Sequence, residues 1–176
     1  YSPTERGVEI VAPERRRGMK FGEMIHRALS QVEWLDEVDV EKCIAGVVEY
    51  TKDIFARSTE DEREIDERLG PLLRDTLLDP DLRFLFYKNG RDMRCRNELP
   101  IYFEEEKRDV SAHIDRLIIG RDEIVIADYK TGGEKEEYKK QLRVYKKGIE
   151  KIYPGRPTRT LMVYLEKEKG KKIAEV

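Results

Sequence analysis

A hairpin of two apolar strands, within residues 111–132, is the part of this sequence that most restricts how the chain can fold. Residues 110–119 and 123–130 are dense in Ile, Val and Leu, which favour β-structure. The short segment Gly120-Arg-Asp between them is typical of a tight turn. The sequence therefore predicts two antiparallel strands that pair directly with each other.

The turn determines which side chains of the two strands face each other. If Gly120 and Glu123 flank a two-residue turn, Asp115 lies directly opposite Asp128. Opposed residues share a face of the sheet, with Cβ atoms roughly 4.5–5.5 Å apart. Lys130 projects from the same face, because it lies two residues beyond Asp128. The register thus predicts two carboxylates and an ammonium group at one place on the sheet.

Two ionised carboxylates at such a separation repel each other. One of them can take up a proton, a basic side chain can lie between them, or a cation can bridge them. A bridging divalent metal ion is the interpretation that we favour. The alternatives are surface ion pairs of Asp115 with Arg116 and of Asp128 with Lys130. Asp128, however, interrupts an apolar run in a strand expected to be central, where an unpaired charge is costly.

Apolar spacing divides the rest of the chain into three parts. Residues 1–19 contain prolines and a run of arginines without periodicity, and we expect a leading arm there. Residues 20–88 show helical spacing, which predicts helices beginning near residues 21, 40 and 59 and a short one at 81–87, with Pro71 breaking or kinking the third. Residues 89–176 predict strands at 93–103, with Pro100 as a candidate interruption, and at 158–166, and a helix at 134–153.

This order of elements predicts a single α/β domain covering residues 1–176. Three antiparallel strands are followed by a helix and a last strand, and such a crossover makes a parallel pair. We therefore expect a mixed β-sheet, with antiparallel hairpins and one parallel crossover strand, flanked by helices. The active site would lie in the sheet part, at residues 89–176.

Charge and cysteine content exclude several classes of protein. Charged residues make up 41% of the chain, yet the net charge is only −2, so any binding of nucleic acid must use local patches. Cys43 and Cys95 are too few for an all-cysteine iron–sulfur or zinc site, and we expect no iron–sulfur cluster. No signal peptide or apolar run of membrane length occurs, so we expect a cytoplasmic protein without a membrane partner. The first residue, Tyr1, suggests a fragment of a longer protein.

Four short motifs resemble those of a nuclease family. Ile114-Asp-Arg and Ala127-Asp-Tyr-Lys-Thr-Gly resemble the signature of the PD-(D/E)XK nuclease superfamily, in its RecB-like branch. Gly22-Glu-Met-Ile-His26 is similar to the G-x-x-x-H element of that branch, and Gln141-Leu-Arg-Val-Tyr145 to its Q-x-x-x-Y element. The opening arm and residues 21–34 resemble the nuclease domain that follows the motor in UvrD/Rep-type helicase–nucleases such as RecB and AddA. The resemblance implies a restriction-endonuclease-like core.

The resemblance also implies a metal site. His26, Asp115 and Asp128, with the backbone carbonyl of Tyr129, would bind Mg²⁺, and the histidine nitrogen makes Mn²⁺ acceptable as well. On residues alone the role of His26 stays open, because a single histidine beside an apolar stripe is usually structural. Glu98 lies where the family often has an acidic residue one strand earlier, and we include it among the metal ligands.

Further residues take roles in catalysis and in DNA binding. Asp115, Asp128 and Lys130 would form the catalytic group, with Lys130 as the catalytic lysine. The implied contacts with DNA are Gln141, Tyr145, Arg116 and Thr131. His113 shares the predicted face of Asp115, which leaves a contact with substrate open, and Tyr138 and Tyr145 are alternatively core aromatics.

The chain is therefore predicted to hydrolyse phosphodiester bonds of DNA, as an exonuclease domain of a helicase–nuclease in recombination or repair. It has no G-x-x-x-x-G-K-[ST] loop, so we expect the helicase motor elsewhere in the full-length protein or complex. Two other functions stay open: a catalytically idle DNA-binding clamp, and a stand-alone structure-specific endonuclease.

Overall fold

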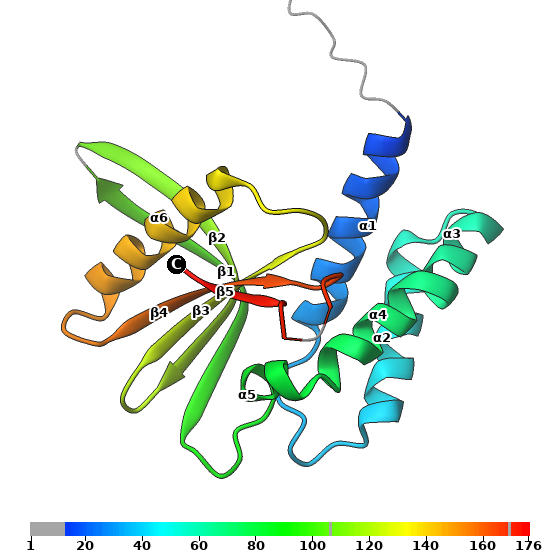
Figure 1. Cartoon of the computed structure of the whole chain (residues 1–176), viewed down its shortest axis with the longest axis horizontal. Helices are drawn as coiled ribbons and strands as arrows, with labels where there is room; N and C mark the ends of the chain where they lie inside the picture. The colour runs from blue at the N-terminus through cyan, green and yellow to red at the C-terminus, as the bar shows by residue number, and fades with distance from the viewer. Residues whose placement is uncertain (1–12, 106, 169) are drawn as a thin grey trace, which may run out of the picture.

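Five strands form one mixed sheet in the computed structural model, which describes residues 13–105, 107–168 and 170–176 (Figure 1). The strands are β1 (Met93–Glu105), β2 (Arg108–Gly120), β3 (Ile124–Lys130), β4 (Thr158–Tyr164) and β5 (Ile173–Glu175), and they lie side by side in that order. The β3–β4 pair is parallel and the other neighbours are antiparallel. The predicted α/β architecture, with antiparallel hairpins and one parallel crossover strand, is confirmed.

Helices cover both faces of this sheet. One face packs against α1 (Pro13–Ser30), α2 (Val40–Phe55), η1 (Ile65–Leu69), α4 (Gly70–Leu77), η2 (Pro80–Leu82) and α5 (Arg83–Phe86); the other packs against α6 (Glu136–Ile152). The short helix α3 (Thr59–Glu64), between α2 and η1, has no buried residue. Along β3, Val125 and Ala127 join the first core, whereas Ile124 and Ile126 join the second beneath α6. This burial on both sides explains why the strand reads as a nearly continuous apolar run.

The first helix begins earlier than predicted. Residues 13–19 are helical rather than part of an arm, and the predicted arm otherwise lies outside the described residues. Pro13 suits the first turn of a helix, and arginine is a good helix former. Met19 is exposed, so this part of α1 has no apolar face to bury and its sequence shows no apolar period.

Pro71 neither ends nor breaks the third helical segment. The chain passes from α3 through the π-helical turn η1 into α4, where Pro71 occupies the first turn. The N–H of Gly70 donates to the carbonyl of Ile65, five residues earlier. A π turn moves the hydrogen bonds by one residue, and the proline enters a new first turn, where its missing N–H is tolerated.

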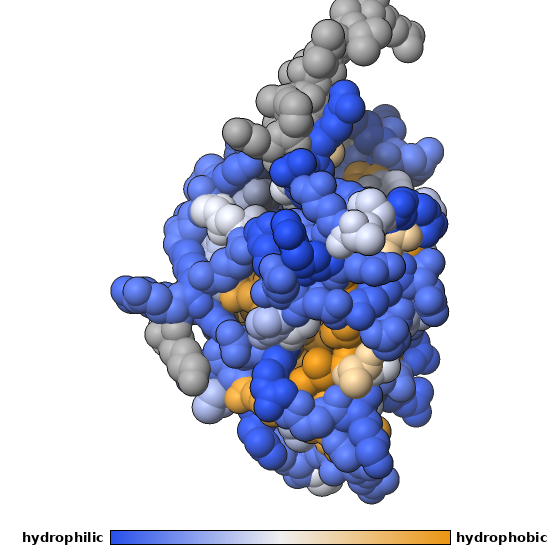
Figure 2. Space-filling model, turned by 90° about the vertical axis from the view of Figure 1, so that its right-hand side faces the viewer, coloured by the Kyte–Doolittle hydropathy of each residue, from blue (hydrophilic) through white to orange (hydrophobic). Residues whose placement is uncertain are grey.

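The surface on the side of α1–α4 is mostly hydrophilic, with an apolar patch towards its lower part (Figure 2). Opposite charges pair across it, for example Arg17 with Glu60 at 3.3 Å and Arg68 with Glu166 at 3.0 Å. Among the residues that the structure describes, no helix combines the length and apolar character needed to cross a bilayer.

Close packing of α6 on β1 leads to a first prediction. A Cβ atom on Gly148 would lie 2.7 Å from Cε1 of Phe103 and 2.8 Å from Cδ1 of Ile101. We expect Gly148→Ala to lower the free energy of unfolding by about 1–3 kcal/mol, measured by urea denaturation.

Gly46 in α2 provides the matched control, because a Cβ atom there meets nothing within 4 Å. Gly46→Ala should leave stability unchanged or raise it by up to about 1 kcal/mol. Equal unfolding midpoints for Gly148→Ala and the wild type would contradict the packing of α6 described above.

Candidate active site

The side chains of strand β1 switch from one face of the sheet to the other at Glu98. Met93 packs against the core of α1–α5, and Asn97 donates to the carbonyls of Ser30 and Val32 on the same side. Leu99 and Ile101 carry odd numbers as well, yet they pack in the core beneath α6. Regular alternation would keep all four on one face. The reversal falls at Glu98, whose backbone is left-handed with φ of 50°.

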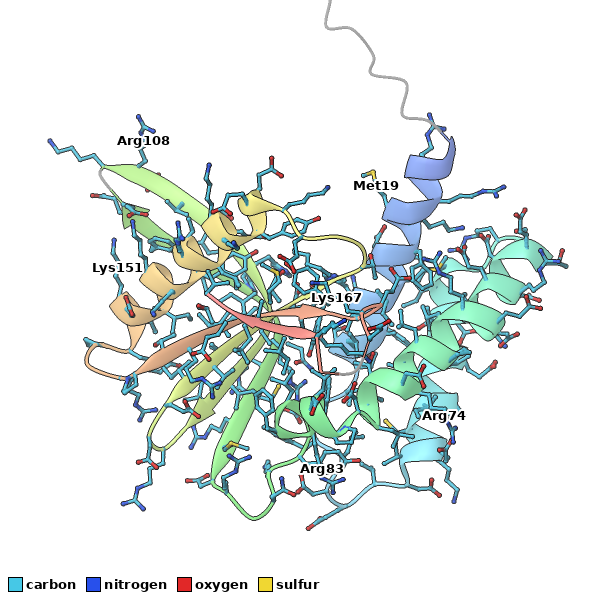
Figure 3. All side chains as sticks on the ribbon, viewed as in Figure 1. Met19, Arg74, Arg83, Arg108, Lys151 and Lys167 are labelled. Carbon is cyan, nitrogen blue, oxygen red and sulfur yellow. The ribbon has the colours of Figure 1, made fainter. Side chains whose placement is uncertain are left out.

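The side chains of strand β2 also switch faces, at Asp115, the residue that lies opposite Glu98 in the pairing of the two strands. Asn97 pairs with Arg116 and Leu99 with Ile114, which brackets Asp115 opposite Glu98. Ile118 lies in the core of α1–α5, whereas Ile114 lies beneath α6, although both carry even numbers. The hairpin thus twists at Glu98 and Asp115, and its outer part projects past β3 to a tip that carries Arg108 (Figure 3).

Pro100 does not interrupt β1. It pairs with His113 and is exposed on an edge strand, where a missing N–H costs nothing. The backbone irregularity lies two residues earlier, at Glu98.

Three predicted metal ligands converge at this twist. His26 from α1, Glu98 from β1 and Asp115 from β2 each offer one ligand atom, and these atoms all lie within 4.8 Å of one another. Nδ1 of His26 lies 3.3 Å from Oδ1 of Asp115. The other carboxylate oxygen of Asp115, Oδ2, accepts a hydrogen bond of 2.7 Å from the backbone N–H of Tyr129. Residues 26, 98 and 115, far apart in the sequence, are therefore neighbours in space.

The register predicted for the hairpin is confirmed. Gly120 N–H donates to the carbonyl of Glu123, which closes the turn, and Arg116 pairs with Ala127 as the facing rule requires. Asp128, the next residue on β3, is 1% exposed, and its Oδ2 lies 2.7 Å from Nζ of Lys130. This ion pair lacks hydrogen-bond geometry, so Oδ2 is buried without a hydrogen bond among the described residues.

Lys130 is also held from the side of α6. Its ammonium group donates to Oε1 of Gln141 at 3.4 Å and lies 4.7 Å from the ring centroid of Tyr138. The amide of Gln141 in turn donates to the hydroxyl of Tyr145. Burial raises the pKa of the Tyr145 phenol, and the charges of Asp128 and Asp115 raise it further, so the hydroxyl keeps its proton. Tyr138, for which the sequence left a role as a core aromatic open, is thus both a neighbour of the lysine and partly buried against the core beneath α6.

The residues present fit a divalent cation. Carboxylate oxygens together with one imidazole nitrogen suit Mg²⁺ or Mn²⁺. Burial raises the pKa of Glu98, and the charge of Asp115 raises it further, because the two carboxylates lie close together. Among the described residues, Asp128 is not in this group of mutually close ligand atoms, and its Oδ2 atom is paired with Nζ of Lys130 at 2.7 Å, so its role as a ligand stays a prediction. The Tyr129 carbonyl as a further ligand stays a prediction.

The predicted contact of Arg116 with DNA is wrong. Its side chain is completely buried on the side of α1–α5, on the opposite face of the sheet from Lys130 and α6. The guanidinium donates to the backbone carbonyls of Leu85, Val32 and Glu33 and to Oδ1 of Asn97. Through these hydrogen bonds Arg116 connects the helical part of the chain to β1 and β2. Thr131 remains near the site, with its hydroxyl beside Gly22 of α1.

Protons should compete with the metal for this site. Burial raises the pKa of the Asp128 carboxyl to about 6; the charge of Asp115 adds to the rise and Lys130 partly opposes it. Burial lowers the pKa of His26, but the hydrogen bond and charge of Asp115 outweigh it and the net pKa is raised. Both groups therefore hold protons in acid, and both must lose them to bind a metal.

We expect the apparent affinity for Mn²⁺ to fall as the pH drops through the raised pKa of His26, and more steeply below about 6, where Asp128 also takes up a proton, by about tenfold per pH unit for each proton displaced. Titration calorimetry at about pH 5 and about pH 7.5 measures this difference. Asp128→Asn should bind Mn²⁺ more weakly at high pH, with a shallower dependence on pH. Equal affinities of the wild type at the two pH values would contradict the prediction.

Comparisons with known proteins agree with the motifs. Two solved structures resemble the chain weakly. Protein VC1899 from Vibrio cholerae has 11% sequence identity and a TM-score of 0.35, and the match covers 86% of this chain and 43% of the Vibrio chain. SSO0001 has 14% identity and a TM-score of 0.37, and the match covers 92% of this chain and 76% of SSO0001. The chain thus spans less than half of the Vibrio protein. No curated protein sequence matches significantly. The model of the PD-(D/E)XK nuclease superfamily matches residues 4–176, and the chain belongs to that superfamily.

Proposed function

We propose that this chain is a metal-dependent deoxyribonuclease of the RecB-like branch, acting as the exonuclease domain of a helicase–nuclease in DNA recombination and repair. The observation that carries the proposal is the convergence of His26, Glu98 and Asp115 beside the Asp128–Lys130 pair. The chain's membership of a nuclease superfamily supports the reaction class. The position of His26 on α1, beside Asp115, supports the branch that carries a G-x-x-x-H element.

A phosphodiester is an anion, and its hydrolysis adds negative charge in the transition state, so the site must supply positive charge. The carboxylates of Asp115, Asp128 and Glu98 and the imidazole of His26 would hold Mg²⁺ or Mn²⁺. The bound ion would polarise a phosphate oxygen and lower the pKa of a water molecule.

Lys130 is the cation that the chain itself provides. Asp128, Gln141 and the Tyr138 ring restrict the position of its ammonium group, and the side chain as a whole is 15% exposed. From there it would orient the attacking water and stabilise the charge that develops on the phosphate. Tyr145 is 4% exposed in the core beneath α6, and its hydroxyl accepts from Gln141 and retains its own proton, so it would act chiefly by positioning Gln141.

DNA and a helicase motor are the proposed partners. Gln141 and Tyr145 adjoin the lysine from α6, and Thr131 lies beside Gly22 of α1; these three residues are the proposed contacts with the DNA backbone. The motor would belong to the same full-length protein or complex, in the cytoplasm.

The proposal is tested by digestion of end-labelled single-stranded and double-stranded DNA with Mg²⁺, Mn²⁺ or EDTA. We expect the wild type to degrade linear DNA only when a divalent ion is present, and Asp128→Ala to be inactive. Asp122→Ala, in the β2–β3 turn away from the ligands, is the control and should retain activity.

Three outcomes would change the assignment. A wild type that is inert with each metal but shifts DNA in a gel would be a clamp. Cleavage of closed circular DNA would identify an endonuclease. Full activity of Asp128→Ala would show that the proposed site is wrong.

A further inference from the structure

His113 lies next to the Glu98 carboxylate on the open face of the hairpin. Its Nδ1 atom is 3.2 Å from Oε2 of Glu98, and its side chain is 54% exposed. His113 pairs across the strands with Pro100, two residues beyond Glu98, so the contact runs diagonally between β2 and β1. Diagonal neighbours on one face of a sheet are within reach of long side chains.

Each acidic residue at the site has a partner of its own. The backbone N–H of Tyr129 holds Asp115, and Lys130 holds Asp128. Within residues 13–105, 107–168 and 170–176, His113 is the one side chain outside the proposed ligand group that pairs with Glu98. His113 therefore contacts Glu98, as the N–H of Tyr129 contacts Asp115 and Lys130 contacts Asp128.

Glu98 needs such a partner more than the aspartates do. Its backbone is in the left-handed region, which is unfavourable for a residue with a Cβ atom. Its carboxylate also lies close to that of Asp115, and the two repel each other when no cation is between them. A free glutamate side chain would rotate away into solvent, since it is 31% exposed.

We propose that His113 is a positioning residue that keeps the Glu98 carboxylate directed at His26 and Asp115 and thereby strengthens metal binding. The proposal rests on the metal site of the proposed function. The contact does not require a charged imidazole, because the neutral ring can carry its proton on Nδ1 and donate it to the carboxylate. Partners of this kind orient metal ligands, and their loss typically weakens metal affinity by about 10- to 100-fold.

A role of His113 in holding substrate makes a different prediction. If the imidazole only touched DNA, its removal would weaken DNA binding and leave metal affinity in the absence of DNA unchanged. Direct measurement of Mn²⁺ binding without DNA therefore separates the two roles.

Titration calorimetry with Mn²⁺, on protein free of DNA, is the test. We expect His113→Ala to bind Mn²⁺ about tenfold more weakly than the wild type. His113→Asn should recover most of the affinity, because an asparagine amide can place a donor close to the position of Nδ1. In a Glu98→Gln background, His113→Ala should have no further effect, because the histidine acts through that carboxylate.

Ser111→Ala is the control, since Ser111 is exposed on the same strand two residues away. It should bind Mn²⁺ like the wild type, and far-ultraviolet circular dichroism confirms the folding of each variant. Wild-type affinity in His113→Ala, or an equal loss in the Glu98→Gln background, would overturn the positioning role. Failure of the wild type to bind Mn²⁺ at all would overturn the metal site itself, and the two failures are therefore distinguishable.

Discussion

Lys130→Ala should reduce the rate of DNA cleavage by about 100- to 1,000-fold at saturating metal. The ammonium group is the chain's own positive charge beside the proposed ligands, and the variant loses it without replacing it. Affinity for Mn²⁺ should stay the same or increase, because removal of the ammonium frees the Asp128 oxygen that lies 2.7 Å from it. Single-turnover cleavage of end-labelled DNA, together with calorimetry, measures both effects.

Lys135→Ala is a matched control for this experiment. Lys135 lies over the same Tyr138 ring, with its Nζ 5.6 Å from the ring centroid, but among the described residues it is Lys130, and not Lys135, that forms an ion pair with Asp128. The control should cleave DNA at nearly the wild-type rate. If Lys130→Ala behaved like the control, Lys130 would have no catalytic role.

Arg116→Ala should lower the free energy of unfolding by about 3–5 kcal/mol. The buried guanidinium donates to the carbonyls of Leu85, Val32 and Glu33, and the alanine leaves all three without this donor and opens a cavity. Urea denaturation measures the loss. Arg116→Lys should recover only part of it, because an ammonium group cannot reproduce the planar fork of donors.

Arg94→Ala provides the control, because Arg94 is exposed on β1. Its stability should lie within about 0.5 kcal/mol of the wild type. DNA affinity of Arg116→Ala, measured at a temperature where the variant is folded, should equal that of the wild type. Unchanged stability with weakened DNA binding would instead restore the interpretation of Arg116 as a DNA contact.

The error over Arg116 has a simple physical origin. Arg116 follows Asp115 directly, and successive side chains of a strand point to opposite faces of the sheet. The alternation that places Leu117 beneath α6 places Arg116 towards α1–α5, away from Lys130. The alternation of side chains along β2 therefore already argued against a DNA contact of Arg116.

Other features carried no usable sequence signal. The strand β5 has only three residues, too few for a period of two to be visible. The left-handed backbone of Glu98 falls on a glutamate, a residue type that rarely adopts this conformation, so the sequence does not indicate it. The contact of His113 with Glu98 depends on the register of β1 and β2, whose turn near residues 105–108 has no glycine to predict its form.

The sequence by itself determined the hairpin register, the two-sided burial of β3 and the order of the elements. Each of these depends on local information: a turn of defined length, a side-chain period of two, and the runs of apolar residues. Only the tertiary structure decided that His26 and Glu98 meet Asp115, that Tyr138 and Gln141 hold Lys130, and that Arg116 joins the helices to the sheet. These contacts join residues far apart in the chain, and they depend on how helices pack on a sheet that reverses its facing at Glu98, which no local pattern specifies.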